Sequence, residues 1–231
     1  SLLLSDNAFN YPYARITQQW FNGRLQYTNI YAVLMNYMDY AATVPNANTE
    51  QLYQKKAASF QYLSANPAKW LNLGFFQGMI WQAGDSRNQQ HLNWHYVNPV
   101  IYTNLPAYGL NNKNNLLIGM DLKVKISDHL NIYGQLMADD LSDTTKTGNG
   151  YGFQTGINYF NALGIKNLFL QAEYNNVSQS SYGNPLGAKP DQSYYHYGQA
   201  LAYTPGNGQE LVLIANYRHH RFYADLKYNY Q

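Results

Sequence analysis

Two adjacent segments of strictly alternating character constrain the fold of this chain more than any other feature. In residues 116–126 the even positions, Leu116 to Ile126, are all apolar, whereas the odd positions from Gly119 to Lys125 hold glycine, aspartate and lysine. The same alternation restarts over residues 130–140, after Ser127-Asp128-His129. A period of two on both sides of a short turn predicts a β-hairpin with one apolar and one polar face.

The length of the two strands in this hairpin narrows the prediction of the fold class. A tilted strand that crosses a membrane needs about 9–11 residues, whereas strands of globular proteins most often have about 5–6. The hairpin therefore predicts part of a transmembrane β-barrel. We expect residues 117, 119, 121, 123 and 125 to face the lumen and the even residues 116–126 to face lipid, because a lysine on the lipid side costs about 2–4 kcal/mol at the bilayer midplane.

The composition agrees with this class. The chain has 231 residues, 24 of them Tyr, with 12% charged residues and a mean hydropathy of −0.49. Soluble proteins usually carry about 25% charged residues. A barrel instead combines a lipid-facing apolar half with a wet lumen, and its two membrane interfaces carry aromatic girdles. The alternative is a soluble β-protein with a tyrosine-rich core, and alternation that persists through many long strands favours the barrel.

Other features exclude several classes. The net charge of +2 and the absence of a Lys/Arg cluster argue against a nucleic-acid partner. The chain has no cysteine and so no disulfide framework. No signal peptide is visible, although an exported protein requires one, so we expect the numbering to begin inside a longer precursor.

The whole chain predicts a single all-β domain, 1–231, with about eleven antiparallel strands. Tight turns are expected at 22–23, 66–68, 127–129 and 162–164, and the two longest breaks at 83–115 and 178–195. Short and long connections alternate in this way in outer-membrane barrels, whose long loops are extracellular. Bacterial barrels of one chain have even strand numbers, so an odd count predicts a segment of a larger barrel. The expected strands are 12–21, 24–39, 55–64, 69–82, 116–126, 130–140, 151–161, 166–177, 196–204, 209–217 and 221–230. In the strand 69–82, Gly74 and Gly78 share the inward face and would leave room for something that fills the lumen.

Four stretches, in order, carry a resemblance to a known family. They are KKAASFQYLSANPAKWLNLGFFQGMIW, LNWHYVNPVIY, NNLLIGMDLKVKISDHLNIYGQLMADD and HYGQALAYTPGNGQELVLIANY. Together they resemble the Wzi-type capsule assembly proteins of the bacterial outer membrane, in particular the motility-associated relatives of gliding bacteria. The family has further N-terminal helices and C-terminal strands that do not appear here.

The resemblance implies a lectin-like, non-enzymatic barrel that holds surface polysaccharide. The implied partners are the lipid bilayer with its lipopolysaccharide, the polysaccharide, and a large motility or secretion complex in which the barrel would be a scaffold. No cofactor is implied. An outer-membrane hydrolase or a pore remains an alternative, and we expect no pore conductance because the loop 83–115 should obstruct the lumen.

Ring-bearing residues of the loops are the candidates for a saccharide surface, because apolar sugar faces stack on aromatic rings. An aromatic girdle would account for the same residues. They are Trp94, Tyr96, Tyr102, Tyr108, Tyr182, Tyr194 and Tyr195.

The charged and metal-binding candidates are fewer. Asp139 and Asp140 end a strand, where they could bind a cation or sugar hydroxyls or simply be hydrated. Glu173 faces inward on its strand, and an ion pair with a lumenal lysine (Lys123, Lys125 or Lys227) is favoured over a ligand site. His91 and His95 have helical i, i+4 spacing with no third ligand nearby, and no serine lies in a nucleophile elbow, so no metal or catalytic residue is predicted.

Overall fold

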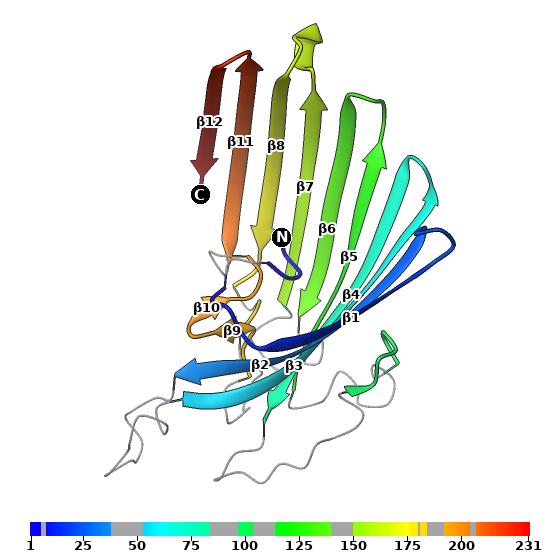
Figure 1. Ribbon diagram of the computed structural model, residues 1–231. Coiled ribbons are helices and arrows are strands. Elements are labelled where there is room, and N and C mark those ends of the chain that lie inside the picture. Colours follow the sequence, from blue (N-terminus) through cyan, green and yellow to red (C-terminus); the bar gives the residue numbers. More distant parts are fainter. Residues whose placement is uncertain are drawn as a thin grey trace.

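The structure, a computed structural model, describes residues 1–5, 8–37, 53–83, 97–103, 114–139, 150–179, 181–183, 192–203 and 207–231. Within these ranges the chain is all-β apart from one short 3-10 segment, η4 (Ala162–Gly164). Ten strands form one antiparallel sheet in chain order, β1-β2-β3-β4-β5-β6-β7-β8-β11-β12 (Figure 1). Among the described residues, no helix has the length and apolar character needed to span a bilayer.

The strands are long. Their bounds are β1 Tyr13–Trp20, β2 Leu25–Tyr37, β3 Tyr53–Ala68, β4 Leu71–Gln82, β5 Asn115–Lys125, β6 Leu130–Asp139, β7 Gly150–Phe160, β8 Leu168–Val177, β11 Gly208–His219 and β12 Phe222–Tyr230. The prediction of an eleventh sheet strand at 196–204 was wrong. That stretch holds a separate two-stranded hairpin, β9 (Tyr195–His196) with β10 (Gln199–Ala200).

Short and long connections lie at opposite ends of the sheet, as predicted (Figure 1). The turns at 22–23, 127–129 and 162–164 are confirmed within the connections 21–24, 126–129 and 161–167. The turn expected at 66–68 was wrong by a few residues, because β3 continues to Ala68 through a register shift after Ala65. An irregularity of this kind accommodates Pro67, which cannot donate to the strand ladder.

The two parities of β5 lie on opposite faces, as its alternation predicts. Leu117 is 0% exposed on the concave face, where Asp121 also accepts a hydrogen bond from Tyr62. Met120 and Leu122 lie on the convex face, where they are 40% and 41% exposed. In the described residues β1 and β12 each pair on one side only, so the sheet is curved but not closed.

The second strand has apolar residues on both parities because both of its faces are covered. Ala32 and Leu34 belong to the buried core on the concave face, and the pairing of β2 with β3 runs without a register shift. On the convex face, residues 97–103 cross β2, β3 and β4. Three contacts fix this crossing: Tyr31 Oη to the Val97 carbonyl (2.9 Å), Gln61 Nε2 to the Asn98 carbonyl (2.6 Å) and the Tyr102 backbone N–H to Gln77 Oε1 (2.8 Å).

Candidate functional site

Two buried tyrosines organise the concave face near the long connections. Tyr182 and Tyr194 are both 0% exposed, and their rings stack with centroids 5.8 Å apart. Their hydroxyls donate to the carbonyls of Leu2 and Leu3, each at 2.7 Å. We call residues 1–5, 181–183 and 192–203 the tyrosine plug, because these two rings hold its three segments together against the sheet.

The sheet is shaped to receive the plug. A Cβ on Gly78 would lie 3.1 Å from the Tyr194 ring, and a Cβ on Gly119 would lie 2.2 Å from Leu3 Cδ2. The absence of side chains at these inward positions therefore makes the room that the plug fills, as the inward glycines of β4 predicted. The plug covers the end of the concave face near the long connections. Residues 97–103, from the loop expected to obstruct the lumen, lie on the convex face instead, so this part of that prediction was wrong.

Asp139 is part of the plug's attachment. Its side chain is 1% exposed at the end of β6, and Oδ2 accepts a hydrogen bond of 2.5 Å from the Tyr182 backbone N–H. Burial is the main cause that raises the pKa of Tyr182, and the negative charge of Asp139 raises this pKa further. Asp139 therefore orders the segment 181–183 and adds to the effect of burial on the pKa of the neighbouring phenol.

A buried lysine and a buried histidine attach the rest of the plug to the strand ends. Lys56, 0% exposed, donates to the carbonyls of Ser193 (2.7 Å) and Tyr195 (2.8 Å). His196 Nδ1 accepts the Met35 backbone N–H at 3.0 Å, which requires an unprotonated Nδ1. Burial lowers the pKa of His196, the charge of Lys56 lowers it further, and the Asn10 backbone opposes both. Neither role has a signal in the sequence.

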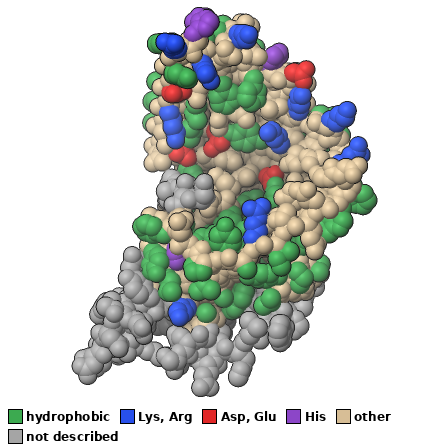
Figure 2. Space-filling view, viewed as in Figure 1, with side chains coloured by type: hydrophobic (Ala, Val, Ile, Leu, Met, Phe, Trp, Pro, Cys, Tyr) green, Lys and Arg blue, Asp and Glu red, His purple; other side chains and the backbone are tan. Residues whose placement is uncertain are grey.

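Polar side chains cover the part of the concave face closer to the tight turns, and Glu173 of β8 lies at their centre. Tyr133 donates to Glu173 Oε2 at 2.5 Å, and Asn175 donates to Oε1 at 3.0 Å. Gln171 donates to the Tyr133 hydroxyl at 2.8 Å. In Figure 2 most of the charged side chains lie over the upper part of the molecule, which is the end of the sheet with the tight turns.

A second carboxylate joins the same network through Asn175. The amide nitrogen of Asn175 also donates to Glu210 Oε2 at 3.1 Å, and Asn229 donates to Glu210 Oε1 at 2.7 Å. Gln154 donates to the side-chain oxygen Oδ1 of Asn175 at 2.8 Å. We call Tyr133, Gln154, Gln171, Glu173, Asn175, Glu210 and Asn229 the carboxylate–amide network.

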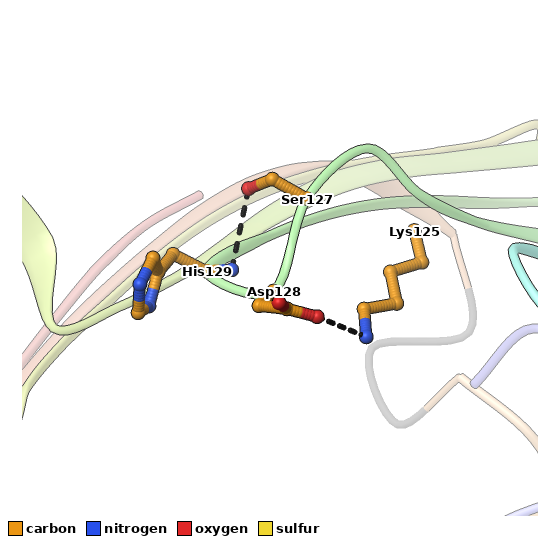
Figure 3. A network of polar contacts seen from close by, with 4 residues as sticks. All are labelled: Lys125, Ser127, Asp128 and His129. Carbon is orange, nitrogen blue, oxygen red and sulfur yellow. Dashed lines mark hydrogen bonds and ion pairs between the residues drawn. The ribbon is translucent and has the colours of Figure 1, made fainter.

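The predicted ion pair of Glu173 with a lysine was wrong. Phenol and amide groups surround this carboxylate, and Lys125 instead pairs with Asp128 at 2.6 Å. Figure 3 shows that pair in the turn between β5 and β6, where the Ser127 hydroxyl also accepts the His129 backbone N–H at 3.2 Å. Lys123 and Lys227 have no carboxylate within ion-pair distance among the described residues.

The predicted saccharide residues are brought together only in part. Tyr182, Tyr194 and Tyr195 lie in the tyrosine plug with Asp139 beside them, but the first two rings are fully buried and offer no face to solvent. Tyr102 lies on the opposite, convex face, where its hydroxyl donates to the Phe76 and Gly119 carbonyls at 3.2 and 3.1 Å. Trp94, Tyr96, Tyr108 and Asp140 lie outside the described residues, as do His91 and His95.

In the part of the chain that the structure describes, no three His, Cys, Asp or Glu side chains are grouped as metal ligands. Comparison with family models, with curated proteins and with solved structures found no match. The candidate site consists of the carboxylate–amide network, with the tyrosine plug beside it towards the long connections.

Proposed function

We propose that this sheet is part of the wall of a transmembrane β-barrel of the bacterial outer membrane, which retains surface polysaccharide without catalysing a reaction. The observation that carries the barrel is the contrast between the faces of β5–β8, β11 and β12. Their convex side exposes large apolar side chains such as Ile132, Leu136, Leu213 and Leu226, between 40% and 68% exposed. Their concave side holds the carboxylate–amide network. Lipid outside and polar groups inside is the pattern of such barrels.

Strand length supports the same proposal. Strands of 10–12 residues, such as β4, β5, β6 and β11, rise about 3.3 Å per residue. At a tilt of about 40° they span roughly 25–30 Å, which is close to the height of the apolar band of outer-membrane barrels. Ten strands in one antiparallel order also leave β1 and β12 antiparallel to each other, so the wall can close directly or through an even number of further strands.

The carboxylate–amide network supports the saccharide part of the proposal. Sugar hydroxyls are bound by carboxylate oxygens and amide groups in fixed positions, and Glu173 and Glu210 are held in place by protein donors. Each carboxylate oxygen can accept about two hydrogen bonds, so Glu173 Oε1 and Glu210 Oε2, which both accept from Asn175, have capacity for a hydroxyl, whereas Glu210 Oε1 already accepts from Asn229 and Gln231. The resemblance to capsule assembly proteins points the same way.

Two measurements test the proposal in turn. The full-length protein should fractionate with outer membranes and migrate faster on gels before heating than after, as closed barrels do. The double variant Glu173→Gln, Glu210→Gln should then retain less surface polysaccharide at an unchanged amount of folded protein. Asp225→Asn, the same chemical change on β12 outside the network, is the matched control. Equal retention by the double variant and the parent would refute the saccharide site.

A polar sector of the convex face favours a second candidate function, that of a scaffold in an envelope complex. Asn29, Gln61 and Gln77 form one row across β2, β3 and β4, and all three are buried on this outer side. Asn29 Oδ1 and Gln61 Oε1 have no hydrogen-bond partner among the described residues. Residues 97–103 cover this row, so irregular backbone lies on the outer side of the sheet here, and such backbone suits contact with protein rather than with acyl chains. Co-purification of a large complex that Gln61→Leu disrupts would favour the scaffold, and intact co-purification would argue against it.

A further inference from the structure

The convex face of the last four sheet strands is hollowed by two alanines. Strand pairing places Ile157, Ala172, Leu213 and Tyr228 in one row across β7, β8, β11 and β12, and Tyr159, Leu170, Ala215 and Leu226 in the next. Each row has one small side chain among large ones, and the small ones lie next to each other. The result is a groove of about 430 Å³ with an apolar lining.

A second hollow of about 760 Å³ adjoins this groove at the tight-turn end, and Tyr159 lines both. Its lining comes from the turns of β5–β6 and β7–β8 and from the adjoining ends of β6 and β7; most of the lining surface is apolar, and Lys166 and His129 are its basic side chains. It consists of Ser127, His129, Leu130, Tyr159, Asn161, Gly164 and Lys166.

The charges around the second hollow leave a net attraction for an anion. No Asp or Glu lines it, and the nearby Asp128 is neutralised by Lys125. Figure 3 shows Lys125 on the other side of that turn from His129. Lys166 is exposed and makes no ion pair with the residues that the structure describes. The adjacent β11–β12 turn adds the exposed His220 and Arg221 at the same end of the sheet.

From this arrangement we infer that the two hollows together bind one anionic glycerophospholipid. The groove over Ala172 and Ala215 takes an acyl chain, Tyr159 lies beside the ester region, and Lys166 with His129 binds the phosphate. The order of apolar, aromatic and basic groups along the wall matches the order of chain, ester and phosphate in the lipid.

The inference rests on the proposed membrane function, which also selects the leaflet. Tight turns of outer-membrane barrels face the periplasm. The site is therefore open to the phospholipids of the inner leaflet, and the lipopolysaccharide of the outer leaflet cannot reach it.

Photo-crosslinking tests the site. The full-length protein is reconstituted in phosphatidylethanolamine vesicles that contain phosphatidylglycerol with a photoreactive acyl chain, and the labelled peptides are mapped by mass spectrometry. Label should concentrate on the strands around Ala172 and Ala215. Ala172→Leu with Ala215→Leu fills the groove without changing its polarity and should disperse the label. Ala138→Leu, on the convex face of β6 outside the groove, should not.

A separate variant tests the part of the site that binds the lipid headgroup. Lys166→Glu should reduce labelling by phosphatidylglycerol by about fivefold or more, the factor that one basic residue contributes beside an anionic surface. Labelling by a photoreactive phosphatidylcholine should change little, and Lys69→Glu in the turn between β3 and β4 should leave both unchanged.

Each remaining outcome overturns the inference. An even spread of label over the convex face of a folded, inserted protein would refute the site while leaving the membrane proposal intact. Crosslinks from the groove to a protein in native envelopes would show that a partner occupies it. A protein that neither inserts nor shows heat-modifiable migration would refute the membrane function and the lipid site together.

Discussion

Removing one buried hydroxyl should release the N-terminal segment without unfolding the sheet. Tyr194→Phe keeps the ring that packs against Tyr182 but deletes the donor to the Leu3 carbonyl. Leu3 is 3% exposed, so water cannot replace the lost donor while residues 1–5 stay in place. The effect should fall on the attachment of these residues, because the strand ladder of the sheet does not involve Tyr194.

The size of the expected effect on the attachment of residues 1–5 follows from the burial of the Leu3 carbonyl. Leaving a buried carbonyl without its donor costs about 1–3 kcal/mol. At about 1.4 kcal/mol per factor of ten, the fraction of molecules with residues 1–5 detached should rise by roughly 5- to 150-fold. Burial raises the pKa of Tyr194 well above its usual value, and the neighbouring Tyr182 raises it further, so the hydroxyl is protonated and donates at any ordinary pH.

Thiol labelling measures this fraction directly. The chain has no cysteine, so Leu3→Cys supplies a single buried reporter in both the parent and the variant background. Its labelling rate by a water-soluble reagent should increase by the factor above in Tyr194→Phe, while migration on unheated gels stays unchanged. Tyr151→Phe, which changes a tyrosine that is 58% exposed on the convex face, is the control. A rate within about twofold of the parent in Tyr194→Phe would show that the hydroxyl does not hold the segment.

Three further predictions concern the faces of the sheet, its packing and its pH dependence. Replacing Ile132, on the convex face, with arginine should lower the free energy of unfolding in bilayers by about 2–4 kcal/mol. Arginine at the adjacent Asn131, on the concave face, should lower it less. Equal losses of stability in unfolding titrations would contradict a lipid-facing convex surface. Gly119→Ala should lower the free energy of unfolding by about 1–3 kcal/mol in the same titration, because the new Cβ would lie 2.8 Å from the Leu136 carbonyl oxygen. An unchanged unfolding midpoint would show that the backbone can move to make room for the Cβ. Acid should loosen the attachment of β9 to β2. Burial lowers the pKa of His196 in the folded chain, so the stability that this group contributes is complete above the ordinary histidine pKa and is lost as pH falls below it and through the lowered pKa of the folded chain. A protection factor of the Met35 amide, corrected for the pH dependence of intrinsic exchange, that does not fall in this window would refute this.

The sheet could be predicted largely from period-two alternation, since this pattern reports directly which face of a strand is buried. The errors arose where another constraint overrides alternation. The stretch 196–204 was expected to be one strand, but Tyr197 and Gly198 have positive φ values of 47° and 75° and turn the chain back on itself. At the end of β3, Pro67 looked like a turn but is absorbed by an irregularity within a continuing strand.

The site was harder to predict because its contacts join distant parts of the chain. Nothing local to Tyr182 distinguishes a ring that stacks on Tyr194 inside the plug from one that faces a ligand. Lys56 also resembles the exposed Lys55 beside it, although it is buried and donates to two carbonyls. Glycine was the useful signal in the sequence. Gly78 faces the lumen without a side chain, which predicted that another group fills the space next to it.

The tyrosine plug also sets an order of assembly. The hydrogen bonds of Leu2 and Leu3 reach partners 180 and 191 residues further along the chain. Contacts of such long sequence separation form late, because the loop they close has to be ordered first. Residues 1–5 therefore stay exposed until the chain has been made as far as Tyr194 and the strands between them have paired. Their burial marks the assembly of this part of the sheet, and a chain that ends before Tyr194 leaves residues 1–5 unanchored, where assembly factors and proteases can bind them.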